Sequence, residues 1–105
     1  MGWIGVDLDG TLAEYDGWKG ADHIGRPVKK MLERVLDWKN AGKDVRIFTA
    51  RASVPEQIPP IDEWCRKHIG QTLPVTNIKD FAMIELWDDR CVQVVPNTGE
   101  RADGK

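Results

Sequence analysis

The apolar run from Trp3 to Leu8 constrains the fold more than any other part of this sequence. It is rich in β-favouring residues and stops at Asp9-Gly10, a pattern typical of a buried central strand that ends in a turn. Further apolar segments of strand length follow along the chain, at residues 44–50, 75–77, 83–87 and 91–95. The sequence therefore predicts a sheet, with the first of these segments buried at its centre.

Two segments between these strands have helical spacing. One begins near Pro27, has apolar residues three or four positions apart, and stops at Gly42. The other begins near Ser53 with one short turn, is interrupted at Pro59-Pro60, and is expected to restart and close at Gly70. Strands that alternate with helices favour an α/β fold with a mainly parallel sheet, which we expect to be a Rossmann-like three-layer sandwich.

Length and charge limit what else the chain can be. Its 105 residues correspond to one domain, expected at residues 1–96, with residues 12–26 as a flap and residues 97–105 as a flexible tail. Lys and Arg number 15 against 17 Asp and Glu, a net charge of −2, so only a local basic patch would favour nucleic acid.

Hydropathy and cysteine usage predict the compartment. No segment approaches the about 20 apolar residues of a membrane span, and no secretory signal is visible, so we expect a cytoplasmic protein with no membrane partner. Cys65 and Cys91 are too few and too isolated for a disulfide framework or a zinc site. We expect both to be buried, reduced thiols.

Three of the predicted strands end in polar residues that are costly to leave unpaired. The three endings are Asp7-Leu8-Asp9-Gly10-Thr11, Thr49-Ala50-Arg51 and Asp88-Asp89. In a parallel sheet all three lie at one edge, where ligands collect. Four carboxylates crowded there would repel one another unless a cation lay between them, and hard oxygen ligands of this kind suit Mg²⁺.

The spacing of Asp7 and Asp9 suits acid and nucleophile chemistry. The two residues alternate with Leu8, so both side chains point to the same side of the strand and can converge on one ligand in the turn that follows. One carboxylate can attack a phosphoryl group and form an aspartyl-phosphate while its neighbour moves protons on and off the leaving group. Gly10 lets the backbone turn sharply and approach a phosphate closely.

These motifs resemble those of the haloacid dehalogenase-like (HAD) hydrolase superfamily over residues 3–95. Asp7-Leu8-Asp9-Gly10-Thr11-Leu12 is similar to its first motif, Thr49 to its second and Asp88-Asp89 to its fourth. The resemblance implies that Asp7 is the nucleophile and a Mg²⁺ ligand, and that Asp9 is the general acid/base with its backbone carbonyl on the metal. Thr49 would hydrogen-bond a phosphoryl oxygen, and Asp88 with Asp89 would complete the magnesium site.

The family also uses a lysine that neutralises the phosphoryl group, and Lys79 is expected to fill this role. Lys67 is the alternative. About six residues separate the predicted strand at 75–77 from Met83, too few for a helical crossover, so the lysine would arrive on a loop or at a vestigial strand.

Other polar and aromatic residues have two interpretations each. Arg51 is expected to contact the substrate together with Gly10 and Thr11, or else to form a salt bridge with Asp88 or Asp89, and Arg90 has the same two roles. Tyr15 and Trp18 either stack on a base or sugar of the leaving group or pin the flap to the body. Asp22 and His23 either contact the substrate or stabilise the flap.

The chain has no room for the cap domain of larger superfamily members, so the site should be open. An open site suits a bulky phosphorylated substrate such as a nucleic-acid end or a protein, or else a second subunit in a homo-oligomer covers it. The sequence does not choose between a nucleotide, a polynucleotide end and a sugar phosphate. We therefore expect a Mg²⁺-dependent phosphomonoester hydrolase. The rivals are a non-catalytic Mg²⁺- and phosphate-binding regulatory domain and a phosphoacceptor domain of the response-regulator kind.

Overall fold

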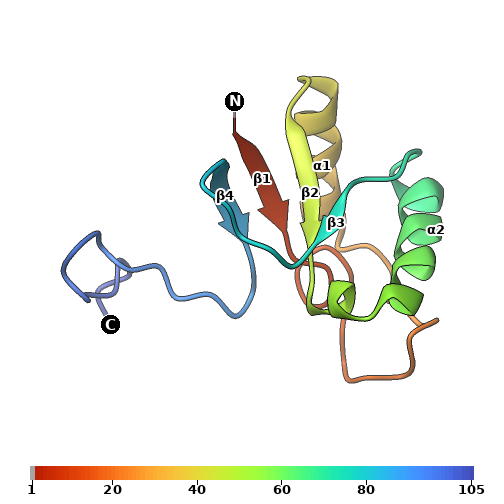
Figure 1. The fold of residues 1–105 in the computed structure, drawn as a ribbon, viewed down its shortest axis with the longest axis horizontal. Helices are drawn as coiled ribbons and strands as arrows, with labels where there is room; N and C mark the ends of the chain where they lie inside the picture. Colours follow the sequence, from red (N-terminus) through yellow and green to blue (C-terminus); the bar gives the residue numbers. More distant parts are fainter. Residues whose placement is uncertain (1) are drawn as a thin grey trace.

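A computed structural model describes residues 2–105, so residue 1 of the expected domain lies outside the described part. Four strands form one all-parallel sheet in the order β3-β2-β1-β4 (Figure 1). The strands are β1 (Trp3–Val6), β2 (Asp44–Phe48), β3 (Val75–Thr76) and β4 (Met83–Trp87), and the helices are α1 (Lys29–Asn40) and α2 (Ile58–His68). The α/β fold and the parallel sheet predicted from the sequence are confirmed.

The register of the central strands sets the position of the site. Val6 at the end of β1 is paired with Ile47 on one side and with Trp87 on the other. The residues that follow these three strand ends therefore emerge side by side at one edge of the sheet.

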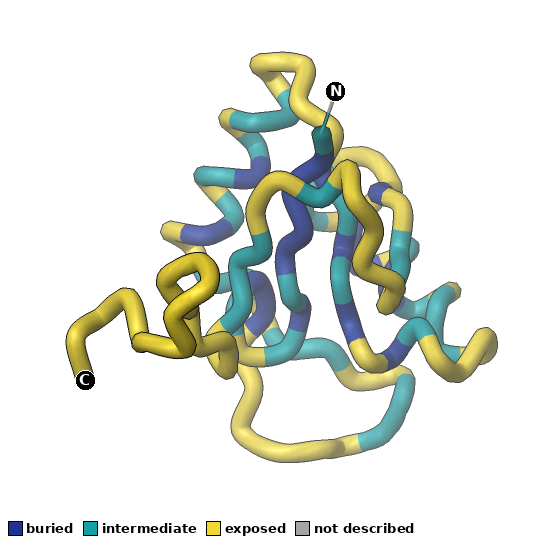
Figure 2. The backbone as a smooth tube through the Cα atoms, turned by 60° about the vertical axis from the view of Figure 1, so that its left-hand side comes forward, coloured by how far each residue is buried: buried dark blue, intermediate teal, exposed yellow. Residues whose placement is uncertain are grey.

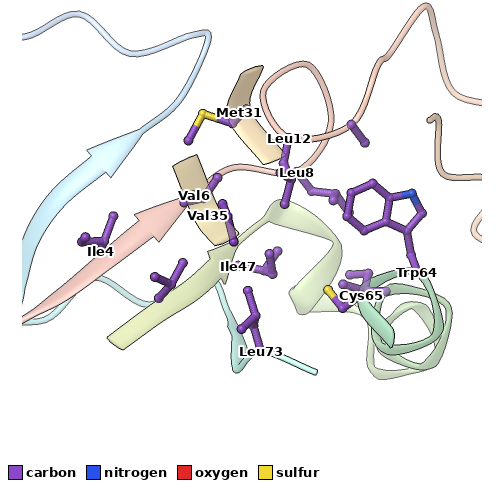
Figure 3. Close-up of a cluster of buried hydrophobic side chains, with 13 residues drawn as sticks. Ile4, Val6, Leu8, Leu12, Met31, Val35, Ile47, Trp64, Cys65 and Leu73 are labelled. Atoms are coloured by element: carbon purple, nitrogen blue, oxygen red, sulfur yellow. The ribbon is translucent and has the colours of Figure 1, made fainter. Parts of the chain in front are cut away.

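The core lies between the helices and one face of the sheet. Alternate residues of the central strands, Ile4, Val6, Val45 and Ile47, point toward this core because successive side chains of a strand face opposite ways. Figure 3 shows Ile4, Val6 and Ile47 in one cluster with side chains of both helices, among them Met31, Val35, Trp64 and Cys65. Val45 and Ile61 belong to the same cluster. Because α1 and α2 share this cluster, both helices cover the same face.

The opposite face is covered without a helix. Trp3 is only 1% exposed there, with the Arg46 guanidinium 4.6 Å from its ring centroid and Phe48 6.4 Å away. Its indole N–H donates to Asp80 Oδ1 at 2.8 Å, which ties the β3–β4 connection across this face. The expected three-layer sandwich is therefore wrong for the described residues, which form two layers, because this connection is too short to hold a helix.

Both helices begin and end where the sequence indicates a boundary. Gly42 follows the end of α1 with a φ of +77°, a left-handed conformation that glycine adopts at little cost. Two short 3₁₀ turns, η1 (Ala50–Ser53) and η2 (Pro55–Gln57), precede α2. Pro59 and Pro60 lie in the first turn of α2, where a proline costs no hydrogen bond, so the expected restart of the helix is confirmed.

The segment after β4 departs from the prediction. The strand expected at residues 91–95 does not form, and the segment extends away from the sheet as an exposed arm that turns back on itself through a bridge between Val94 and Arg101 (Figures 1 and 2). Cys91 is exposed there, not buried, whereas Cys65 is buried as expected. Neither described helix has the length and hydropathy needed to cross a membrane.

Candidate metal site

Three carboxylates gather at the carboxyl edge of the sheet. Asp7 follows β1, Asp88 and Asp89 follow β4, and one carboxylate oxygen from each lies within 4.8 Å of the others. The backbone N–H of Asp7 donates to the Trp87 carbonyl at 2.9 Å, which extends the β1–β4 pairing by one residue into the site. The parallel register thus brings together acidic residues about eighty positions apart in the sequence.

The electrostatics of this cluster favour a cation. Burial, together with the negative charges of Asp88 and Asp89, raises the pKa of Asp7 from 3.8 to about 7. A bound divalent cation would reverse this effect by compensating the charge that the three groups share. The donors are all carboxylate oxygens, which fits a hard cation such as Mg²⁺. The three aspartates could therefore hold a metal ion.

Gly10 and Thr11 close the loop over the acidic cluster. Gly10 has a φ of +91°, and a Cβ built on it would lie 2.6 Å from Asp89 Oδ2. The Thr11 hydroxyl lies 3.1 Å from Asp89 Oδ1 and 3.4 Å from Asp7 Oδ2, and it accepts from the Asp89 backbone N–H at 3.0 Å. These two residues, expected to contact the substrate, thus fix how Asp89 approaches the β1 loop.

Asp9 is held apart from the cluster by an arginine. Both of its carboxylate oxygens accept from Arg51, Oδ2 from Nε at 2.8 Å and Oδ1 from Nη2 at 2.9 Å. Arg51 is only 5% exposed, so this two-point ion pair is largely shielded from water. The salt bridge of Arg51 is therefore to Asp9 and not to Asp88 or Asp89, which sequence reasoning had offered as partners.

Arg51 also ties down the flap. Its Nη1 donates to the carbonyl of Ala21 at 3.1 Å, and its Nη2 donates to the carbonyl of His23 at 3.0 Å. Its guanidinium lies 4.8 Å from the centroid of the Trp18 ring. One buried side chain thus connects the end of β2, the Asp9 carboxylate and the flap.

Thr49 follows β2 as the N-cap of η1. Its hydroxyl oxygen accepts from the Arg51 backbone N–H at 3.2 Å, and its own backbone N–H donates to the Thr76 carbonyl at 2.9 Å. The hydroxyl hydrogen is left to donate to a ligand. Thr49 is buried and borders the same cavity as the aspartates.

A cavity of about 830 Å³ connects these groups. Its walls include all four strand-end aspartates, Thr49 and Arg51, and the flap contributes Tyr15 and Trp18. The structure thus brings together most of the residues that the sequence singles out. Arg90 and Asn77 also border it, and the sequence offered no reason to select Asn77.

The two lysines considered for phosphate neutralisation lie outside this cavity. Lys79 is exposed on the β3–β4 connection and is not among the residues that border the cavity. Lys67 lines a separate cavity beside α2, together with Asp22 of the flap. Among the described residues, the positively charged side chains that border the acidic cavity are Arg51 and Arg90.

Comparison with known proteins adds information about the fold. The chain matches no protein-family model and no curated protein. It is similar to a solved structure of the conserved protein coded by a locus from Bacteroides thetaiotaomicron, with a TM-score of 0.66 and 22% identity over 90% of this chain and 80% of that one. The fold is shared with a solved protein. At this level of identity the likeness extends to the fold alone.

Proposed function

We propose that the protein is a Mg²⁺-dependent phosphomonoester hydrolase that works through an aspartyl-phosphate. The observation that carries the proposal is the cluster of Asp7, Asp88 and Asp89, whose carboxylate oxygens lie within 4.8 Å of one another in a cavity shared with Asp9 and Thr49. The order of the motifs, which resembles the HAD superfamily, supports the same chemistry.

Three side chains would hold the metal: Asp7, Asp88 and Asp89. The resemblance adds the backbone carbonyl of Asp9. When bound, Mg²⁺ supplies the positive charge that lets an anionic phosphate approach this acidic edge.

Asp7 then acts as the nucleophile. One of its carboxylate oxygens attacks the phosphorus, the bond to the leaving oxygen breaks, and Asp9 gives a proton to that oxygen. In the second step Asp9 takes a proton from water, the water oxygen attacks the phosphorus, and inorganic phosphate leaves Asp7. The Thr49 hydroxyl donates a hydrogen bond to a phosphoryl oxygen in both steps.

The positive charge that balances the phosphate is proposed for Lys79 from the resemblance, and Arg90 is the alternative because it borders the cavity. Replacing each by methionine and measuring kcat separates the two. Replacing the residue that supplies the charge should lower kcat roughly a hundredfold or more, which is the effect of removing a hydrogen-bond donor from an oxyanion hole.

One pair of observations favours a non-catalytic Mg²⁺- and phosphate-binding domain as the second candidate. Both oxygens of Asp9 are occupied by Arg51, and Lys79 lies away from the cavity. A domain of this kind would bind the metal and phosphate without turnover.

The deciding experiment measures phosphate release from an aryl phosphate with Mg²⁺, with chelator, and with Asp7→Asn. Release that needs Mg²⁺ and is lost in Asp7→Asn supports the hydrolase. Asp37→Asn is the matched control, because Asp37 is an exposed aspartate on α1. A phosphorylated oligonucleotide serves as a second substrate, since an open site can require a large one. Calorimetric Mg²⁺ and phosphate binding with no release from either substrate would instead establish the binding domain.

A further inference from the structure

An exposed tryptophan stands at the acidic cavity. Trp18 is 54% exposed, although it is the largest side chain of the flap and borders the cavity that holds Asp7. Tyr15, also on the flap, is 50% exposed and borders the same cavity. Large aromatic surfaces left in water at the wall of a cavity are typical of binding sites, because their burial against a ligand is favourable.

Trp18 packs against Arg51. The Arg51 guanidinium covers one face of the indole, with its carbon 4.8 Å from the ring centroid. Arg51 itself is immobilised, because it is 5% exposed and donates to Asp9 and to the carbonyls of Ala21 and His23. An immobilised guanidinium against one face of the indole restricts the positions that the ring can adopt, which lowers the entropy cost of binding against it.

Because Trp18 stays 54% exposed with Arg51 against one face, we expect a ligand to bind at the other face. A flat aromatic ring would cover it by stacking, and the cavity of about 830 Å³ has room for such a ring together with a sugar and a phosphate at Asp7. The apolar side chains of Phe48 and Val54 border the cavity as well. One end of the cavity is therefore suited to a phosphate and another to an apolar, planar group.

We propose that Trp18, clamped by Arg51, is a stacking subsite for the nucleobase of a nucleotide phosphomonoester. The inference rests on the proposed function, since it names the leaving group of that same site. Stacking of a base on an aromatic side chain is sequence-tolerant, so the subsite selects the presence of a base and not its identity. A mononucleotide and the phosphorylated end of an oligonucleotide present the same chemistry to it.

The test compares substrate preference in the Mg²⁺-loaded protein of 105 residues. The preference is the ratio of kcat/KM for adenosine 5′-monophosphate, and separately for a 3′-phosphorylated oligodeoxynucleotide, to kcat/KM for glycerol phosphate, which has no ring. Trp18→Leu should lower this ratio roughly tenfold in at least one nucleotide arm, and Trp18→Phe should restore most of it. The arm that responds identifies the source of the base.

Phe81→Leu is the matched control, because Phe81 is a fully exposed aromatic residue outside the cavity and should leave the ratio unchanged. An unchanged ratio in Trp18→Leu would overturn the subsite, and so would an equal loss for all substrates, which would indicate a purely structural role in the flap.

A second readout separates this inference from the proposed function. The dissociation constant of adenosine 5′-monophosphate is measured by calorimetry in Asp7→Asn, with and without Trp18→Leu. Roughly tenfold weaker binding in the double variant supports the subsite even where no substrate is hydrolysed. Equal binding of adenosine 5′-monophosphate by the two variants would overturn the subsite. It would also be overturned if neither variant bound adenosine 5′-monophosphate or the oligonucleotide.

Discussion

Replacing Asp7 with asparagine should stabilise the metal-free protein at alkaline pH. The pKa of Asp7 lies at about 7 in the folded chain, against an ordinary value of 3.8, because burial and the charges of Asp88 and Asp89 disfavour its ionised form. A carboxyl whose folded pKa is raised contributes stability below its unfolded pKa, and that stability is lost as the pH rises through about 7. Asparagine has nearly the same shape and no charge to lose.

The size of the effect follows from the pKa. A rise from 3.8 to about 7 corresponds to at most roughly 4 kcal/mol, at about 1.4 kcal/mol per pH unit. Because the Asp7 side chain is only partly buried, solvent screening reduces this to about 2 kcal/mol. For a domain of this length that corresponds to a gain in Tm of about 10 °C.

Thermal unfolding in chelator at pH 8 and pH 4.5 measures the effect. The gain should be full at pH 8 and only about a quarter as large at pH 4.5, where Asp7 is protonated in the folded wild-type chain but mostly ionised in the unfolded chain. Excess Mg²⁺ should stabilise the wild-type protein more than the variant and so reduce the difference at pH 8. Equal Tm values at pH 8 in chelator, or a gain of the same size at both pH values, would refute the reasoning. Asp37→Asn should show neither change.

Three further substitutions test the remaining parts of the site. Asp88→Asn should raise the Mg²⁺ dissociation constant at least about tenfold by calorimetry; an unchanged value would mean that Asp88 does not touch the metal. Gly10→Ala should cost about 1–3 kcal/mol in urea unfolding, because its φ of +91° strains an alanine and the new methyl group would meet the Asp89 carboxylate. It should weaken Mg²⁺ binding as well, and a neutral result in both assays would contradict the observed packing. Arg51→Met should cost about 3 kcal/mol in urea unfolding and should also lower kcat, because the partly buried Asp9 carboxylate loses its partner. A change in stability with an unaltered kcat would leave Arg51 a structural role only.

The position of the acidic cluster could be predicted because it follows from strand geometry. Asp7 and Asp88 each follow an apolar run, and in a parallel sheet such residues must emerge at the same edge. No side-chain contact had to be known in advance. The same rule brought Thr49 to this edge.

Features that depend on tertiary packing could not be predicted in the same way. Val92, Val94 and Val95 have the composition of a strand, yet no strand forms there, because strand pairing depends on an available partner that local sequence does not reveal. The partner of Arg51 was equally hidden, since the end of β2 lies near several carboxylates and only the loop geometry selects Asp9.

The exposed position of Lys79 arises from the β3–β4 connection. This connection must cross from one side of the sheet to the other within a few residues, and Asp80 is anchored to Trp3 on the way. The spacing of a motif predicts where a lysine lies in the sequence. It does not predict in which direction the side chain points when the connection is so short.

The contacts between Arg51 and the flap bear on how the site could evolve. The two flap contacts are made to backbone carbonyls, at Ala21 and His23, which every amino acid supplies. Side chains in the flap can therefore be substituted while Arg51 keeps its hydrogen bonds to the flap backbone and to Asp9. Under the proposed function, selectivity for the leaving group and proton transfer are in this way separable, and the protein could acquire new substrates by substitutions within a single short loop.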